Sequence, residues 1–246
     1  MISVSKNHIF IGKRLHICQG DGRRMGNVEC PTLYFQYCGE INTEKTLLAA
    51  RNRCKALGLT KVIVASETGR SALRALDVFK DLDVVLIVVT HYPASTWGPK
   101  GRIPIGLGRQ EYAETRATLV SKGARIVQGT RPFAPPSRSL DWNSPTPEAI
   151  VDKTLEVFGA GTKIAIEAAI IAVDSGEVGE GEDIISCAGT FKGLDTALFV
   201  RPTYTMNFFK SFEIREIIAR PVCRVHELPE HEQKNWKGNL DQYLVE

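Results

Sequence analysis

One six-residue turn combines three hydroxyls, a carboxylate, a glycine and a guanidinium, a set that suits an anionic ligand. Its residues are Ser66, Glu67, Thr68, Gly69, Arg70 and Ser71. The turn follows a β-branched apolar run at 61–65 and precedes a helical pattern, so backbone N–H groups and the positive end of the helix dipole favour a phosphate there. Arg70 adds a planar guanidinium that can bind two phosphate oxygens. The alternative is an ordinary hydroxyl-rich N-cap on a strand–helix connection.

A second turn, rich in glycine, lies between two predicted strands at 183–188 and 196–201. Its residues of interest are Gly189, Thr190, Gly193, Asp195 and Thr196. Glycine frees backbone N–H groups to point at an anion, but a plain β-hairpin also needs glycine for positive φ. Ligand contact and a plain hairpin therefore both stay open. Lys192 is a further cation at this turn, and Asp195 can instead cap its own turn.

Two more polar segments come at the ends of predicted strands. Thr90, His91 and Tyr92 lie at the end of the apolar run that begins at residue 84, and Gly129, Thr130 and Arg131 follow the strand predicted at 124–128. In a parallel sheet the connecting loops meet beyond the carboxyl ends of the strands, where ligands bind. We therefore expect these four polar segments to converge on one site.

His91 and Glu167 are the two candidates for acid–base chemistry. His91 directly follows an apolar strand and can serve as a general base or as a structural hydrogen-bond partner. Glu167 lies on an otherwise apolar stretch, and an unpaired buried charge is costly, so it needs partners. It can tie down backbone, pair with Arg70 or Arg201, or act as a catalytic carboxylate. We expect no metal site, because no histidine spacing in the chain fits one.

Apolar runs of strand length alternate with helical patterns along most of the chain. Strands are predicted at 32–37, 61–65, 84–90, 124–128, 183–188, 196–201 and 214–220, and helices at 43–56, 71–80, 109–122 and 146–158. The stretch 163–173 is apolar on every side except Glu167, as in a buried helix. This alternation predicts right-handed βαβ crossovers and a three-layer α/β/α sandwich with a mostly parallel sheet. The last strands are expected to include an antiparallel pair at the edge of the sheet.

The turn at 66–71 also carries a family resemblance. With Ala72 it is similar to the Thr-x-Ser-Gly-Arg-Ser-Ala turn of the pyruvate kinase C-terminal domain, and more broadly residues 32–221 resemble the stand-alone proteins with that α/β domain. The shared pattern runs through Asn42-Thr43-Glu44, Thr90-His91-Tyr92, Phe158-Gly159-x-Gly161, Glu167, Asp174-x-Gly176, Gly189-Thr190-x-x-Gly193-x-Asp195-Thr196-Ala197, Arg201-Pro202 and Asn207-Phe208-Phe209.

The resemblance implies the pyruvate kinase C-terminal-like fold without pyruvate kinase activity, because the phosphoryl-transfer residues of those enzymes belong to a separate barrel domain. It also implies flavin mononucleotide (FMN) as cofactor, since stand-alone relatives are associated with it. Tyr92, Trp97 or Phe208 would then cover the isoalloxazine ring. One departure is Trp142, which stands in the loop 136–143 where the family has small residues.

The composition is that of an ordinary globular protein. The chain has 246 residues, 43% of them hydrophobic and 24% charged, and a formal net charge of +3. No apolar run reaches the roughly 18 residues that a membrane span needs, and basic residues are not interleaved with aromatic ones as in nucleic-acid-binding proteins. Six cysteines without C-x-x-C spacing indicate reduced thiols. We therefore expect a cytoplasmic protein with neither a membrane nor a nucleic-acid partner.

The chain divides into three parts. Residues 1–31 form an extension with a possible β-hairpin, 32–221 form the α/β domain, and 222–246 form a tail that is either helical or reaches a neighbouring subunit of a homo-oligomer. The leading hypothesis is binding of a phosphorylated small molecule. Two alternatives are an enzyme acting on a phosphorylated metabolite through His91 and Glu167, and an effector-sensing or assembly module without turnover.

Overall fold

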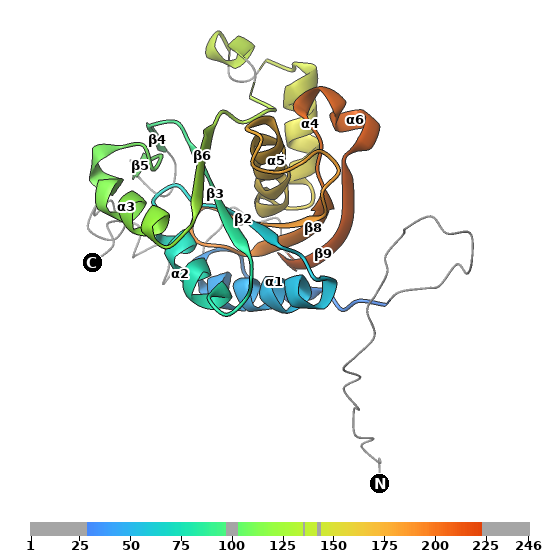
Figure 1. Cartoon of the computed structure of the whole chain (residues 1–246). Helices are drawn as coiled ribbons and strands as arrows, with labels where there is room; N and C mark the ends of the chain where they lie inside the picture. Colours follow the sequence, from blue (N-terminus) through green and yellow to red (C-terminus); the bar gives the residue numbers. More distant parts are fainter. Residues whose placement is uncertain (1–28, 97–102, 135, 142–143, 223–246) are drawn as a thin grey trace.

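The computed structural model describes residues 29–96, 103–134, 136–141 and 144–222. The proposed N-terminal hairpin, nearly all of the C-terminal tail, Trp97 and Trp142 lie outside these residues (Figure 1). Among the described helices, none combines the length and apolar character that a membrane crossing requires.

The described chain is built on a seven-stranded, mostly parallel sheet. Its strands, in spatial order, are β1 (Leu33–Phe35), β9 (Glu213–Pro221), β8 (Thr196–Arg201), β7 (Ile184–Ala188), β2 (Lys61–Ala65), β3 (Val85–His91) and β6 (Arg125–Gly129). All run in one direction except β8, which is antiparallel to both of its neighbours. A separate antiparallel pair joins β4 (Ala94–Thr96) to β5 (Ile103–Ile105). The predicted α/β class with a mostly parallel sheet is confirmed.

Helices cover both faces of this sheet (Figure 1). The helices are α1 (Thr43–Leu57), α2 (Arg70–Phe79), α3 (Ala113–Ser121), α4 (Pro147–Glu156), α5 (Ala160–Asp174) and the short α6 (Phe208–Ser211). Alternate residues of β2 serve the two faces: Val62 and Val64 belong to the core under α1 and α2, whereas Ile63 belongs to the core under α5. This follows from the two-residue side-chain period of a strand.

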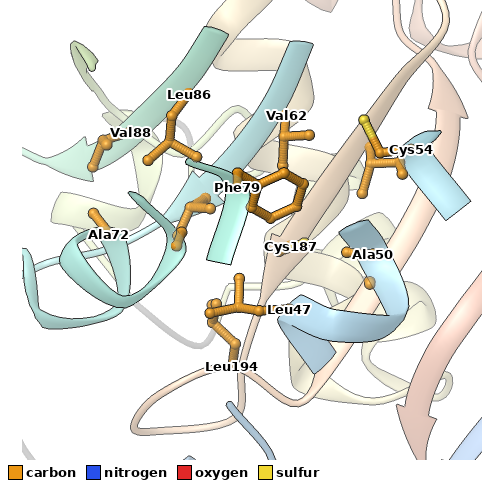
Figure 2. Packing of buried hydrophobic residues seen from close by; sticks show 14 of the residues in the cluster. Leu47, Ala50, Cys54, Val62, Ala72, Phe79, Leu86, Val88, Cys187 and Leu194 are labelled. Atoms are coloured by element: carbon orange, nitrogen blue, oxygen red, sulfur yellow. The ribbon is translucent and has the colours of Figure 1, made fainter. Parts of the chain in front are cut away.

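The core under α1 and α2 is closely packed. Figure 2 shows Leu47, Ala50 and Cys54 of α1 facing Phe79 and Val62, and all five are at most 4% exposed. On the opposite face α5 is buried on nearly all sides, as its apolar sequence predicts. The structure describes four cysteines, and none of these four forms a disulfide. They are Cys30, Cys38, Cys54 and Cys187.

The last strands do include antiparallel pairs, but the prediction that such a pair lies at the edge of the sheet is wrong. The edges are β1 and β6, each paired in parallel with its neighbour, and the antiparallel strand β8 is internal. The reason is that the short β1 returns to cover β9, where Phe35 enters the core and the Thr32 hydroxyl donates to the Ile217 carbonyl at 2.9 Å. The helix expected over 109–122 likewise begins with a 3-10 turn at Gln110–Tyr112 before α3.

Candidate functional site

A cavity of about 370 Å³ lies at the carboxyl ends of β2, β6 and β7. It is called the main cavity below. Its walls come from the loop between β2 and α2, the start of α5, the turn at 189–193 and three single residues. The lining residues are Glu40, Ala65, Ser66, Glu67, Thr68, Arg70, Ser71, Ile105, Arg131, Ala160, Lys163, Ile164, Gly189, Phe191, Lys192 and Gly193.

A small cavity of about 50 Å³ adjoins it at the end of β3. The two share Ala65, Glu67, Arg131 and Ile164, and the small cavity adds His91 and Glu167 to its walls. The predicted convergence of loops at one edge of the sheet is therefore present in the geometry.

The loop between β2 and α2 is held close to neighbouring elements. Gly69 has φ of 87°, and a Cβ at this position would lie 2.3 Å from Thr115 Cγ2. Only glycine combines this left-handed backbone with so close an approach. Since Gly69 is the N-cap of α2, no N-cap side chain bonds the N–H groups of the first turn. An external anion can take the place that a capping side chain usually fills.

Arg70 lines the main cavity and is paired with a carboxylate that the sequence did not indicate. Its Nη2 lies 3.0 Å from Glu40 Oε1, and Arg74 Nη2 lies 3.5 Å from the same oxygen. Lys192 Nζ lies 3.8 Å from Glu40 Oε2. Glu40 therefore sits among three cations at one side of the cavity. No local pattern around residue 40 marks this role.

The start of α5 brings a second helix N-terminus to the same cavity, from the opposite face of the sheet. Its N-cap, Gly159, also makes no side-chain cap, and Ala160, Lys163 and Ile164 face the cavity. Lys163 is largely buried, with Nζ 3.3 Å from Asp152 Oδ1 and 3.6 Å from a Glu156 oxygen. The one local signal for this lysine is a cation in the first turn of an otherwise apolar helix.

The buried Asp195 stabilises the glycine-rich turn through hydrogen bonds to its side chain. It is fully buried, and its Oδ2 accepts the N–H groups of Gly39 at 2.8 Å and Thr190 at 3.1 Å, while Oδ1 accepts the Thr196 hydroxyl at 2.8 Å. Burial raises the pKa of the Asp195 carboxyl, against the opposing effect of these donors. Asp195 and Thr196 thus shape the turn and do not line either cavity.

The turn itself is tight and conformationally strained. A Cβ on Gly193 would lie 2.4 Å from Thr43 Oγ1 and 2.6 Å from Glu40 Cα, and a Cβ on Gly189 would meet the Gly193 carbonyl. Phe191 has φ of 65°, the one positive value among described residues other than glycine. A bulky residue in this region is a genuine outlier, and such outliers concentrate at ligand sites.

Beneath the cavity lies a network of buried charges centred on Arg131. Its Nε donates to Glu167 Oε2 at 2.7 Å and its Nη2 to Asp152, which also pairs with Lys163 and Arg138. Burial lowers the pKa of Arg131, but Glu167 and Asp152 outweigh it and the net shift is upward. Burial raises the pKa of Glu167 even beside Arg131. Glu167 therefore has the ionic partner that its apolar helix requires, and the partner is Arg131 rather than Arg70 or Arg201.

The loop after β3 is tied to the loop after β2 by Glu67. Its Oε2 accepts the His91 N–H at 3.1 Å and the Thr90 hydroxyl at 3.3 Å. His91 Nδ1 lies 3.1 Å from the Tyr92 carbonyl oxygen. His91 borders the small cavity together with Glu67 and Arg131.

The predicted site residues fall into three groups. Seven line the main cavity, and they are Ser66, Glu67, Thr68, Arg70, Ser71, Gly189 and Gly193. Thr90, His91 and Glu167 line the small cavity. Six line neither, and they are Gly69, Tyr92, Thr130, Thr190, Asp195 and Thr196. Glu40 and Lys163 are charged residues of the main cavity that sequence reasoning did not single out, whereas Arg131 and Phe191 lie within two of the segments that were expected to converge there.

No known protein-family model matches this sequence. Within the described part of the chain, no group of three or more histidine, cysteine, aspartate or glutamate side chains could hold a metal ion.

Proposed function

We propose that this protein binds a phosphorylated small molecule in the main cavity. The observation that carries the proposal is the arrival of two helix N-termini, those of α2 and α5, at one cavity that also contains Arg70, Lys163 and Lys192. Uncapped first-turn N–H groups and positive helix ends bind phosphate, and guanidinium and ammonium groups add charge-assisted bonds. The volume of the main cavity, about 370 Å³, lies in the usual range for small-molecule pockets.

FMN is the ligand we propose, together with a fold of the pyruvate kinase C-terminal type, on the strength of the resemblance over residues 32–221. The residues present fit this group: one part of the cavity is cationic, and Ile105, Ile164 and Phe191 offer apolar surface for a ring. Tyr92 and Phe208 do not line the cavity, and Phe208 packs on Phe133 with ring centroids 5.1 Å apart. We propose that Phe191, an aromatic residue of the cavity wall, covers the ring in place of Tyr92 and Phe208.

A second candidate function is a reaction on the bound phosphorylated metabolite. The observation that favours it is the small cavity, where His91 and Glu167 line a space that adjoins the main cavity at Arg131. A histidine beside a substrate pocket can act as a general acid or base. Loss of turnover in His91→Ala with unchanged ligand affinity would support this reading over binding alone.

Titration with FMN and riboflavin tests the leading proposal, because the two ligands differ only in the phosphate. Binding is measured by the quenching of flavin fluorescence. The affinity for FMN should be at least about 10-fold higher than the affinity for riboflavin, a difference of about 1.4 kcal/mol in binding free energy. Lys192→Met should weaken FMN binding, whereas Lys153→Met, at a residue outside the main cavity, should leave it within about twofold. Equal affinities for both ligands would contradict a phosphate site, and native mass spectrometry would report the bound mass and the subunit count.

A further inference from the structure

The main cavity contains a carboxylate among its cations, which phosphate binding alone does not require. Glu40 lines the cavity with Arg70 and Lys192, and its side chain is 24% exposed. A carboxylate close to a phosphate repels it, so its presence weakens the binding of a ligand that offers anionic groups only. A carboxylate is instead useful to a ligand that brings hydrogen-bond donors, because it only accepts such bonds.

The position of Glu40 is built into the fold. The preceding residue, Gly39, donates its N–H to the buried Asp195 at 2.8 Å. The Glu40 backbone also lies so close to Gly193 that a Cβ there would approach Glu40 Cα to 2.6 Å. The carboxylate is therefore carried by backbone that is anchored to the turn at 189–193 and not by a freely moving surface segment.

One oxygen of Glu40 retains capacity for a ligand. Oε1 faces both Arg70 at 3.0 Å and Arg74 at 3.5 Å. Among the described residues, the ionic partner of Oε2 is Lys192, whose Nζ lies 3.8 Å away, which is longer than a hydrogen bond. Glu67, the other carboxylate in the cavity wall, uses Oε2 for the His91 N–H and the Thr90 hydroxyl. Glu40 Oε2 is therefore a carboxylate oxygen in this wall that can accept a hydrogen bond from a ligand.

We propose that Glu40 is a specificity-determining residue that accepts a hydroxyl of the ligand, so that the cavity selects polyol phosphates over alkyl phosphates. This inference rests on the proposed phosphate site. The phosphate is held by the helix N-termini and cations, and a hydroxyl further along the ligand donates to Glu40 Oε2. A site with a carboxylate placed for a hydroxyl discriminates against the analogue without it, because the carboxylate then loses its water without gaining a donor.

The test is a cycle of two ligands and two proteins. Sorbitol 6-phosphate and n-hexyl phosphate share chain length and phosphate but differ in their hydroxyls. Calorimetric titration at pH 7.5 should show a preference of the wild-type protein for the polyol, and Glu40→Leu should reduce the ratio of the two affinities about 10-fold. Glu44→Gln, on the exposed face of the first turn of α1, should leave the ratio unchanged. Circular dichroism confirms that each variant is folded.

The outcomes separate this inference from the proposal beneath it. If neither phosphate binds the wild-type protein, the proposed function itself is wrong. If both bind and Glu40→Leu strengthens both by the same factor, Glu40 merely competes with ligands for Arg70 and Lys192, and the specificity role is wrong. A fall in the ratio with Glu40→Leu and not with Glu44→Gln supports it.

Discussion

Asp195 and Gly39 lie 156 residues apart in the chain, yet the Asp195 carboxylate accepts the Gly39 N–H at 2.8 Å. The same oxygen accepts the Thr190 N–H at 3.1 Å. One buried carboxylate therefore fixes the segment that carries Glu40 and the turn that carries Phe191 and Lys192. Two walls of the main cavity depend on it.

Asp195→Asn should lower the free energy of unfolding by about 2 kcal/mol at pH 7, because an NH2 donor replaces one of two oxygens that both accept hydrogen bonds, from the Gly39 and Thr190 N–H groups and from the Thr196 hydroxyl. Urea denaturation measures this change. Asp77→Asn, at an exposed position, should change stability by less than about 0.5 kcal/mol. Equal losses in the two variants would show that the Asp195 contacts contribute nothing special.

The pH dependence of the Asp195 contribution has a definite sign. Burial raises the pKa of this carboxyl in the folded state, so the folded protein binds its proton more tightly than the unfolded chain does. The part of the contribution that comes from this pKa shift is therefore complete below the unfolded pKa of about 4 and is lost as pH rises through the folded pKa, whereas the part that comes from the hydrogen bonds remains. The stability advantage of wild type over Asp195→Asn should shrink from pH 4 to pH 7.5. An advantage that grows with pH would contradict the shift.

Glu167→Gln should destabilise the protein by about 3 kcal/mol, because it removes one partner of a buried ion pair and leaves the Arg131 charge only partly compensated. Glu177→Gln is the matched control, since its partner Arg125 is 53% exposed and such pairs contribute under about 1 kcal/mol. Thermal and chemical unfolding of both variants decide the point. Similar losses would mean that Glu167 behaves as a surface carboxylate.

Gly161→Ala should destabilise the fold by about 2 kcal/mol, although alanine favours a helix over glycine by about 1 kcal/mol. The added methyl would lie 2.2 Å from Thr196 Oγ1 and 2.7 Å from Asp195 Oδ1, where the start of α5 packs on the turn. At Gly179 the nearest atom is 3.5 Å away, so Gly179→Ala should be nearly neutral. A stabilising Gly161→Ala would show that this contact can relax freely.

Two substitutions of Phe191 distinguish the effect of its backbone strain on stability from the effect of its ring on ligand binding. Asparagine tolerates the left-handed region, whereas valine does so poorly, so Phe191→Val should be less stable than Phe191→Asn by about 1–2 kcal/mol. Both variants remove the ring from the cavity wall and should bind FMN more weakly than wild type. Unfolding curves and FMN titration report the two effects independently. Full FMN affinity in Phe191→Asn would exclude the ring from the ligand contact.

Local patterns predicted individual elements well. The bounds predicted for 61–65 and 196–201 coincide with β2 and β8, because β-branched apolar runs there end at polar or glycine-containing turns. The buried character of α5 followed from its mostly apolar composition. The position of β8 inside the sheet did not follow, since pairing between β1 and β9 depends on residues about 180 positions apart along the chain, such as Thr32 and Ile217, and leaves no local pattern.

The chain alone determined which loops meet. Parallel strands place the turns that follow them at the same edge of the sheet. The order of the predicted strands and their hydrophobic periodicity therefore indicated that residues 66–71 and 189–193 lie at one edge. Only the tertiary structure decided how the charges pair. Arg70 faces Glu40, and Arg131 rather than Arg70 holds Glu167. Ion pairs are set by distances of a few ångströms between side chains from distant segments, and packing alone establishes those distances.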